Sequence, residues 1–382
     1  MSMNYNHCIW NDLWVKISWS AFNPKGGVAE FYIIVEVLQP KLSGQEQFDC
    51  VEQAVERLQT MEEFRNIVFV WKRFFVSDAV NQCSWFRSPS QAAVSVTQQP
   101  PLNQAKFVLL IYGVENASLY QETDGTTVMK RPNYTHLYNL QMHEKIGNSY
   151  EQTQAIFEQY VHKLAKHQCT LDAHCLRTWL FVKSVDIQYD GMVRARKKLF
   201  AEAGLTPHTH FIASTGIEGH SIHPEVIVML DAYAIQEIKQ EQVRYLYASS
   251  NLNPTYEYGV TFERGTCIRY GDRQHILLSG TASIDNQGKI IYPLQLEKQT
   301  ERAMENIQSL LAEAEAGWSD VTHLIIYLRD IADYENTRIY FEKNYPEIPH
   351  VILLAPVCRP GWLIEVECSA IIEIADYRFN EF

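Results

Sequence analysis

The sequence has eight cysteines, scattered from Cys8 to Cys368, and none of them stands in a CxxC pair. A structural zinc site needs clustered thiol ligands, and a disulfide framework shows regularly spaced cysteines. The GxxxxGK[ST] loop and the HExxH helix are also missing. We therefore expect no metal ion and no cofactor, and we do not expect a nucleoside triphosphate as ligand.

Long apolar runs and an excess of basic residues are lacking too. No segment approaches 18 consecutive apolar residues, and no charged start followed by an apolar core marks a secretory signal. The chain has 33 Lys and Arg against 45 Asp and Glu, a formal net charge of −12, which argues against a broad nucleic-acid surface. The simplest expectation is a soluble cytoplasmic protein that binds neither membranes nor nucleic acid.

Apolar residues are plentiful, and they are arranged in a pattern that is found three times. Hydrophobic residues make up 46% and aromatic residues 12% of the 382 positions, as in well-packed globular units. The pattern is clearest in the last third of the chain. There it predicts a strand at 275–284, a helix at 298–316, a strand at 321–328, a helix at 333–344, and closing strands at 351–355 and 363–370.

The other two copies follow the same order. In the second copy we expect helices at 150–166 and 190–203, a strand at 176–182, and closing segments at 210–219 and 226–235. In the first copy we expect a helix at 45–59, a strand at 67–75, and closing segments at 92–101 and 107–114. The polar segment 115–134 between them is typical of a linker.

Each copy therefore has the order β-β-α-β-α-β-β, which predicts an α+β fold. We expect three units: a degenerate unit at 1–125, a second unit at 126–250, and a C-terminal unit at 251–382 with the main site residues. A sheet with helices on one side must cover its other face, and three units can do this for one another. The prediction is a monomer built as a pseudo-trimer, with sites in clefts between units.

The strongest candidate site lies in the closing strands of the third copy. Arg359 stands in a turn made by Pro356, Pro360 and Gly361, and Glu365 follows on the next strand. The planar fork of an arginine suits a carboxylate ligand. A glutamate on a buried strand donates a proton when burial raises its pKa. Against this stands a plain alternative, a solvated strand face with an exposed arginine.

The repeat favours the functional interpretation. At the place of Arg359 the second copy has Ile217 or a nearby glycine, and opposite Glu365 it has an apolar residue, which we assign to Met229. The first copy is apolar throughout 107–111. A strand with only a structural role has no reason to gain an arginine and a glutamate in one copy alone.

Further candidates lie elsewhere in the second and third copies. Arg177 opens an apolar strand, so it must be paired, face a cavity or reach solvent. The small-residue turn with Thr215 and Gly216 can present backbone N–H groups to an anion. Cys358 has no histidine near it in sequence to activate it, so we interpret it as part of a pocket wall.

The third copy resembles the RidA/YjgF/UK114 family, also described as endoribonuclease L-PSP-like. The resemblance rests on the SGTA strand (279–282), the helix after Gly288, the YLRD strand end (327–330), and Arg359 with Glu365 and Glu367. In that family the arginine binds a substrate carboxylate, which assigns this role to Arg359. Its members have a chorismate mutase-like fold and form trimers with sites between subunits, so three copies in one chain would reproduce the trimer.

A longer stretch resembles the chorismatases, which are RidA-like enzymes. The matching motifs are RTWLFV (177–182), FIASTGIEG (211–219), YEYGVTFERGT (256–266) and VCRPGWLIEVE (357–367). Chorismatases convert chorismate to a hydroxybenzoate or a dihydroxycyclohexadiene carboxylate and release pyruvate. The resemblance implies that Glu365 protonates the substrate and that a cysteine at the place of Cys358 goes with 3-hydroxybenzoate. The binding residues it implies for a small dicarboxylate are Arg359, Arg177, Arg264, Tyr258, Cys358, Thr215 and Gly216.

Two other functions remain open. A RidA-like enamine or imine deaminase would use Arg359 and an activated water, and it needs neither Arg177 nor a strong acid at Glu365. A non-catalytic module that binds a small carboxylate is the second alternative.

Overall fold

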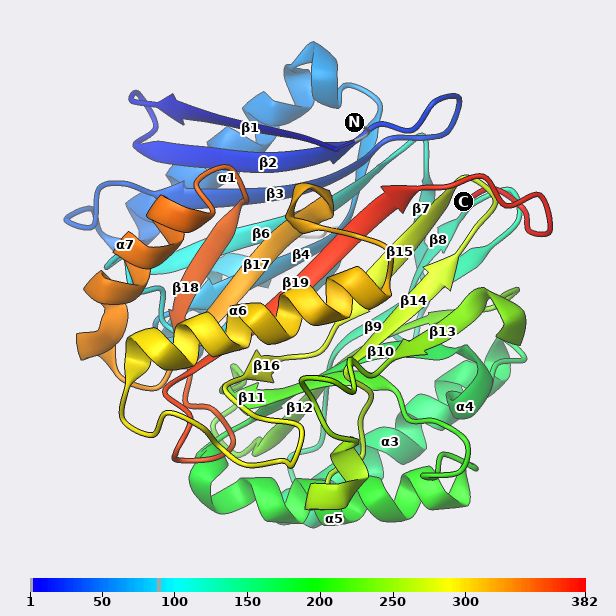
Figure 1. Cartoon of the computed structure of the whole chain (residues 1–382). Coiled ribbons are helices and arrows are strands. Elements are labelled where there is room, and N and C mark those ends of the chain that lie inside the picture. Colours follow the sequence, from blue (N-terminus) through cyan, green and yellow to red (C-terminus); the bar gives the residue numbers. More distant parts are fainter. Residues whose placement is uncertain (1–2, 88–90) are drawn as a thin grey trace.

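The computed structural model describes residues 3–87 and 91–382, and it contains three mixed sheets, each formed by one contiguous third of the chain (Figure 1). The strand orders are β1-β2-β3-β6-β4-β5, β11-β10-β12-β9-β8-β7 and β13-β14-β15-β19-β17-β18, with the short β16 pairing on β19. Three parallel pairs, β4 with β5, β10 with β11 and β17 with β18, occupy equivalent positions, and the other pairs are antiparallel. The predicted α+β class is confirmed.

The bounds of the elements follow the repeat. The first third has β1 (Met3–Trp10), β2 (Val15–Phe22), β3 (Glu30–Val37), α1 (Gly44–Thr60), β4 (Ile67–Val76), α2 (Ala79–Gln82), β5 (Ala93–Gln98) and β6 (Phe107–Glu115). The second has β7 (Ser118–Gln121), β8 (Thr127–Lys130), β9 (Thr135–His143), α3 (Ser149–Lys166), α4 (Leu171–His174), β10 (Cys175–Val182), α5 (Val185–Glu202), β11 (Ala213–Glu218) and β12 (Val228–Ile235). The third has β13 (Val243–Leu246), β14 (Gly265–Arg269), β15 (Arg273–Leu278), β16 (Thr281–Ala282), α6 (Leu296–Glu313), β17 (Val321–Leu328), α7 (Tyr334–Asn344), β18 (His350–Leu354) and β19 (Ile364–Glu373).

The interpretation of residues 115–134 as a linker is wrong. Within this segment β7 and β8 form a hairpin at the edge of the second sheet, with Ser118 opposite Lys130. Its turn includes Gly125 at a φ of +86°, and the backbone N–H of Thr126 donates to the Asp124 carboxylate at 3.0 Å. The β7 side chains are mostly exposed, so they lack the apolar alternation by which strands are predicted. A similar short strand, β13, opens the third sheet. Against the five strands expected in each third, the first two sheets have six and the third, with β16, has seven.

The helices lie on one face of each sheet, and the other faces meet in the middle of the molecule. Helix α6 crosses the third sheet, α1 packs on the first, and α3 with α5 covers the second (Figure 1). Tyr32, Tyr138 and Tyr270 come from different sheets and belong to one buried cluster at the centre. The sheets therefore cover one another, and the hydrophobic effect favours all three together.

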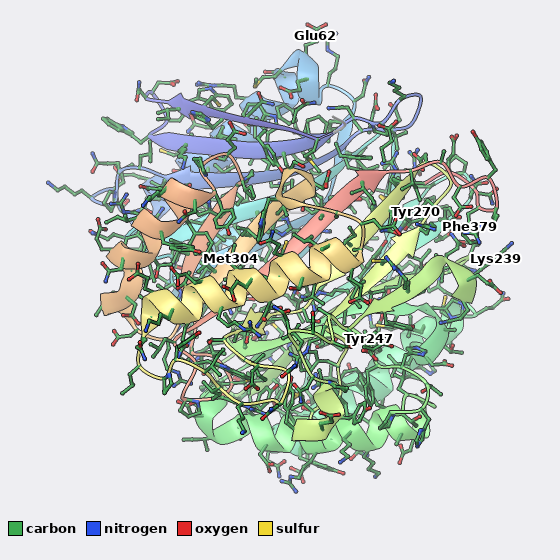
Figure 2. All side chains as sticks on the ribbon, viewed as in Figure 1. Glu62, Lys239, Tyr247, Tyr270, Met304 and Phe379 are labelled. Atoms are coloured by element: carbon green, nitrogen blue, oxygen red, sulfur yellow. The ribbon has the colours of Figure 1, made fainter. Side chains whose placement is uncertain are left out.

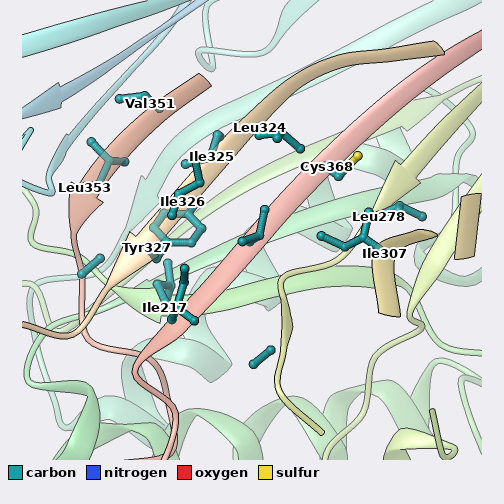
Figure 3. Close-up of a cluster of buried hydrophobic side chains, with 14 of the residues drawn as sticks. Ile217, Leu278, Ile307, Leu324, Ile325, Ile326, Tyr327, Val351, Leu353 and Cys368 are labelled. Carbon is teal, nitrogen blue, oxygen red and sulfur yellow. The ribbon is translucent and has the colours of Figure 1, made fainter. Parts of the chain in front are cut away.

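The largest apolar core lies under α6. Ile307 of α6 belongs to the same cluster as Leu278 and Cys368 of the sheet, all three labelled in Figure 3, and Ile217 of the second sheet belongs to it together with Tyr327. Met304 on α6, labelled in Figure 2, is also buried here. This core extends across the boundary between the second and third units and holds β19 in place.

Backbone bridges join each of the edge strands β5, β11 and β18 to the segment that follows the edge strand of another unit. They link Gln98 with His220, Pro101 with Leu353, and Ile217 with Val357. The last bridge fixes the turn after β18 against the second unit, beside the candidate site.

Candidate active site

A cavity lies between the second and third units, at the end of β19 where the chain leaves the turn after β18. The space enclosed by its walls, with its mouth, amounts to about 530 Å³, within the range usual for small-molecule sites. Residues from both units line it: Tyr189, Arg196, Ser214, Gly216, Tyr258, Val260, Phe262, Arg264, Gly280, Ala282, Ile284, Cys358, Arg359, Trp362 and Glu365.

Glu365 supplies the only carboxyl group among these lining residues. On β19 it lies opposite Tyr327 of β17 and Ala282 of β16, and its side chain is buried. The carboxyl lies on the backbone of Gly280, where a Cβ would stand 2.0 Å from Oε1. Burial, and after it the charge of Glu367, raises the pKa of Glu365 to about 8. The group therefore keeps its proton at neutral pH.

Glu367, two residues further on the same strand face, is in the opposite state. Oε1 accepts from Trp179 Nε1 at 2.6 Å and lies 3.3 Å from Arg177 Nη2. Oε2 accepts from Thr215 Oγ1 at 2.8 Å and from the Tyr327 hydroxyl at 3.3 Å. Burial alone raises the pKa of Glu367, but Arg177, Arg73 and these hydrogen bonds bring it below the usual value. Glu367 is therefore a carboxylate.

Arg359 is held in the turn by its neighbours and by aromatic rings. The backbone N–H of Trp362 donates to the Arg359 carbonyl at 3.0 Å, and Trp362 Nε1 donates to the Ser283 carbonyl at 2.8 Å. The guanidinium lies 4.4 Å from the ring centre of Tyr258 and 5.0 Å from that of Trp362. Stacking fixes the plane of the guanidinium and leaves its N–H donors available.

Two more guanidinium groups, Arg196 of α5 and Arg264 of the loop before β14, face the cavity from opposite units. Arg196 donates from Nε to Thr261 Oγ1 at 3.2 Å and from Nη1 to Ser214 Oγ at 3.4 Å, while its buried Nη2 has no hydrogen-bond partner. Arg264 Nη2 donates to the Asn253 carbonyl at 3.1 Å, and its buried Nε has no partner. Buried donors are rarely left unpaired in proteins, and a ligand with acceptor oxygens in the cavity would supply partners for these two.

The cavity is thus strongly positive. Within residues 3–87 and 91–382, none of Arg196, Arg264 and Arg359 forms an ion pair with an acidic side chain. With Glu365 protonated, the lining carries three positive charges and no negative one. This arrangement suits an anion with two carboxylates better than an anion with one.

Cys358 and Tyr189 complete the wall. Burial, and after it the neighbouring Glu365, raises the pKa of the Cys358 thiol to about 12. A neutral thiol is a poor nucleophile. Cys358 is therefore a pocket-wall residue rather than an attacking group, which agrees with the expectation from the sequence.

Six of the eight residues predicted for the site line this cavity: Glu365, Arg359, Arg264, Tyr258, Cys358 and Gly216. The other two lie one layer behind it. Arg177 donates from Nη2 to Thr215 Oγ1 at 2.6 Å, and both side chains contact Glu367. The structure thus places Arg177 against a carboxylate of the protein and not on the cavity surface.

Arg196 was missed by the sequence analysis. It occupies a buried position of α5 between Met192 and Phe200, at a spacing of four residues. An arginine within the apolar stripe of a helix must be paired or face a cavity. The spacing therefore indicated Arg196 as a candidate site residue.

The equivalent positions in the other two units hold no carboxyl group. Met229 lies opposite Phe181 in the second sheet as Glu365 lies opposite Tyr327 in the third, and Val108 lies opposite Phe75 in the first. The predicted correspondence of Met229 and Glu365 is confirmed by this register. A carboxyl group at this strand position is therefore present in one unit of the three. The predicted correspondence of Ile217 and Arg359 is wrong, because Ile217 lies opposite Phe181 as Leu353 lies opposite Tyr327.

Two searches of the described residues gave no candidates. No group of three or more His, Cys, Asp and Glu side chains is placed to hold a metal ion in the ranges 3–87 and 91–382. In the same ranges no helix is both long and apolar enough to cross a membrane.

Comparisons with known proteins agree on a family for the C-terminal third. The family model described as endoribonuclease L-PSP matches residues 268–372. A RutC family protein of Pyrococcus abyssi is 30% identical over 97 residues, which cover 25% of this chain and 76% of that protein. The chain belongs to the RutC family. Another RutC family protein, from Saccharolobus solfataricus, is 26% identical over 106 residues, 28% of this chain and 82% of that protein.

A solved structure extends the likeness beyond this RutC family region. The crystal structure of a chorismatase matches with a TM-score of 0.62 and covers 79% of this chain and 92% of that chain. At 15% identity the match shows the fold alone. The predicted RidA/YjgF/UK114 resemblance and the chorismatase-like fold are both confirmed.

Proposed function

We propose that this protein cleaves the enol-pyruvyl ether of chorismate and releases pyruvate and 3-hydroxybenzoate. The observation that supports this most is the carboxyl group of Glu365, with a pKa of about 8. It lies in a cavity with three guanidinium groups that have no acidic partner. Protonation of an enol ether needs an acid that still holds its proton near neutral pH. Chorismate has such an ether and two carboxylates.

The charges of ligand and cavity match in this proposal. Arg359 and Arg264 belong to the third unit and Arg196 to the second, so the cations surround the cavity. One carboxylate would leave at least one buried guanidinium without a partner, which costs free energy. A dianion with separated carboxylates satisfies donors from both units. Tyr258, Cys358 and Gly216 then contact the substrate from the remaining walls, and Arg177 with Thr215 supports the site from behind.

The reaction begins when Glu365 gives its proton to the methylene carbon of the enol-pyruvyl group. The carbon–carbon double bond supplies the electron pair for the new C–H bond, and the adjacent carbon and ether oxygen share the resulting positive charge. The Glu365 carboxylate left behind stabilises this oxocarbenium ion. A substrate hydroxyl or a water then captures it.

The two captures give different products. Capture within the substrate, C–O cleavage and loss of a ring proton give 3-hydroxybenzoate and pyruvate, which together contain the atoms of chorismate. The ring proton restores Glu365. Capture by water gives a dihydroxycyclohexadiene carboxylate and pyruvate and consumes one water. We favour the first route because Cys358 occupies wall space that a smaller side chain would leave to water.

The three units, predicted at 1–125, 126–250 and 251–382 and formed by the sheets β1–β6, β7–β12 and β13–β19, are proposed to act as a pseudo-trimer within one chain. A monomer is then a complete enzyme, because both sides of the cavity come from the same chain. No cofactor enters the proposed reaction.

The test is pyruvate release from chorismate, followed through a lactate dehydrogenase coupled assay. Glu365→Gln is expected to lower the rate by about 100-fold or more, the usual contribution of a general acid. Its affinity for chorismate should stay within a few-fold of wild type because glutamine keeps the shape of the side chain. Undiminished turnover would remove Glu365 from the role of the acid.

The same preparation separates the alternatives. A RidA-like deaminase would release ammonia from 2-aminoacrylate and leave chorismate intact. A binding module would bind chorismate, as measured by calorimetry, without any release of pyruvate.

A further inference from the structure

Glu367 is buried and fully hydrogen-bonded, yet it lies outside the cavity that holds Glu365. Its four partners, Trp179, Thr215, Tyr327 and Arg177, come from both the second and the third unit. The first three donate hydrogen bonds and Arg177 forms an ion pair, so all four stabilise the ionised carboxylate. A strand that needed only packing at this place would carry an apolar residue.

The position of Glu367 relative to Glu365 is fixed by the strand. Residues two apart on a strand point to the same face and stand about 7 Å from each other. β19 is held on both sides, by β17 along Ile364–Ala370 and by β15 and β16 on its other edge. Neither side chain can move away from the other without breaking this register.

Two hydrogen bonds also lead from Glu367 to the backbone beside the Glu365 carboxyl. The Thr215 hydroxyl donates its hydrogen bond to Glu367 Oε2. Its oxygen accepts hydrogen bonds from the Gly280 N–H at 3.0 Å and from Arg177. The backbone of Gly280 is the surface on which the Glu365 carboxyl lies. Glu367 thereby orients the hydroxyl that holds this backbone.

We propose that Glu367 is a positioning residue whose fixed negative charge keeps the proton on Glu365 while Thr215 and Gly280 hold that carboxyl toward the cavity. The inference rests on the proposed function, because it assigns a purpose to a protonated Glu365. The arginines near Glu365 draw its proton away, since Arg177 and Arg264 both lower its pKa. The negative charge of Glu367 opposes this effect of the arginines, and its four partners keep the Glu367 carboxylate ionised.

The test uses Glu367→Gln, which removes the charge and keeps the size. Infrared difference spectra recorded across pH 5–10 follow the protonated carboxyl band, which is assigned to Glu365 by its loss in Glu365→Gln. In Glu367→Gln the midpoint of this band is expected about one pH unit or more below that of wild type. The alkaline limb of the kcat profile should move with it. An unchanged midpoint overturns the inference.

Two controls separate charge from structure. Glu367→Asp keeps the charge and should keep the midpoint close to that of wild type. Asp231→Asn removes the carboxylate at the equivalent place in β12, where Trp179 lies opposite Asp231 as Ile325 lies opposite Glu367. Asp231 pairs with Arg73 at 3.1 Å and is not a partner of Glu367. Asp231→Asn should lower stability and leave the midpoint of the Glu365 band unchanged. A shift as large as that of Glu367→Gln overturns the inference.

A second variant covers the case in which Glu367→Gln does not fold. Thr215→Val removes the hydroxyl between Glu367 and Gly280, and it should lower kcat about tenfold or more with little change in KM. Thr215→Ser should restore the rate. Wild-type kcat in Thr215→Val would contradict the positioning role. The infrared midpoint needs no turnover, so it tests Glu367 even where wild-type protein releases no pyruvate and the proposed function fails.

Discussion

Two carboxyl groups on one strand face have opposite protonation states in this protein. The Glu365 carboxyl has no hydrogen-bond donor among the described residues, and its pKa is about 8. The Glu367 carboxylate has three hydrogen-bond donors, an ion pair with Arg177 and a lowered pKa. Carboxyl groups whose pKa values are pushed apart are typical of acid–base sites. The environment of each residue, and not its type, decides its role.

The raised pKa of Glu365 has a measurable effect on stability. The native state binds this proton more tightly than the unfolded chain, whose pKa is the usual 4.5, so the free energy of unfolding falls as pH rises from 4.5 to about 8. Glutamine does not titrate. We therefore expect Glu365→Gln to gain thermal stability over wild type as pH rises from 5 to 9, measured by calorimetry. A difference that does not change with pH would contradict the raised pKa.

Arg359 is expected to contribute binding energy and not stability. Its guanidinium stacks on Tyr258 and Trp362 and has no acidic partner to leave unpaired. Arg359→Ala should weaken chorismate binding by about 2–5 kcal/mol, the cost of losing one member of a desolvated charge pair. Arg378→Ala is the matched control because Arg378 is exposed near the chain end. Titration calorimetry measures both, and equal affinities would remove Arg359 from the site.

The sequence predicted the site residues that stand close together along the chain. Arg359 and Glu365 are six residues apart and differ from the equivalent positions of the other copies. Arg196 lies more than 150 residues earlier, and only the packing of α5 against the third unit brings it to the cavity. The partner of Arg177 was not predictable for the same reason, since Glu367 meets it across a unit boundary.

At the scale of the elements, the site needs the close approach of β19 and the segment before β16. Gly280 permits it, because the Glu365 carboxyl occupies the place of the missing Cβ. Gly280→Ala should displace the carboxyl and lower pyruvate release about tenfold or more, with a modest loss of stability. Gly317→Ala is the control, since its Cβ would meet no atom closer than 4.0 Å. Unaltered kcat in Gly280→Ala would show that the carboxyl tolerates a different position.

Most elements were predicted within a few residues because their apolar periodicity is strong. β17 (Val321–Leu328) has the predicted bounds, and α6 begins two residues before the predicted start. The short strands β7 and β13 were not predicted, because edge strands with exposed side chains leave no apolar pattern. The Asp124–Gly125 turn was the one local signal of the β7–β8 hairpin.

At the scale of the whole molecule, three similar units form three different clefts. The cleft between the third and first units also has a cavity, but Val108 stands there in the place of Glu365. Its arginine, Arg338, is already paired with Glu335 and Glu342. Lys16, which also lines this cavity, lies 3.5 Å from Glu36. Both basic side chains are thus already paired, so this cleft lacks both parts of the proposed site.

A buried ion cluster between the first and third sheets is expected to make the protein acid-sensitive. Glu30 of β3 accepts from Arg273 Nη1 and lies 2.9 Å from His275 Nε2, both on β15. Burial alone raises the pKa of Glu30, but His275, Arg273 and their hydrogen bonds lower it from 4.5 to about 2. The stabilisation from Glu30 is therefore present above pH 4.5 and is lost as pH falls toward 2.

Glu30→Gln tests this contribution. It removes one of the two acidic partners of Arg273, which still pairs with Asp272 at 2.6 Å, so we expect a loss of about 1.5–3 kcal/mol in the free energy of unfolding at pH 7, the range for a hydrogen bond to a charged group. Urea unfolding measured between pH 7 and 2.5 should also fall less steeply below pH 4.5 than in wild type. Parallel curves for the two proteins would show that Glu30 titrates alike in the folded and unfolded states.

The most direct test of the proposed reaction is mass analysis of chorismate after incubation with the wild-type protein and with Glu365→Gln. With wild type the account predicts that chorismate disappears and that pyruvate and 3-hydroxybenzoate appear in equal amounts, while Glu365→Gln leaves chorismate intact on the same timescale. Chorismate that stays intact with the folded wild-type protein would contradict the account.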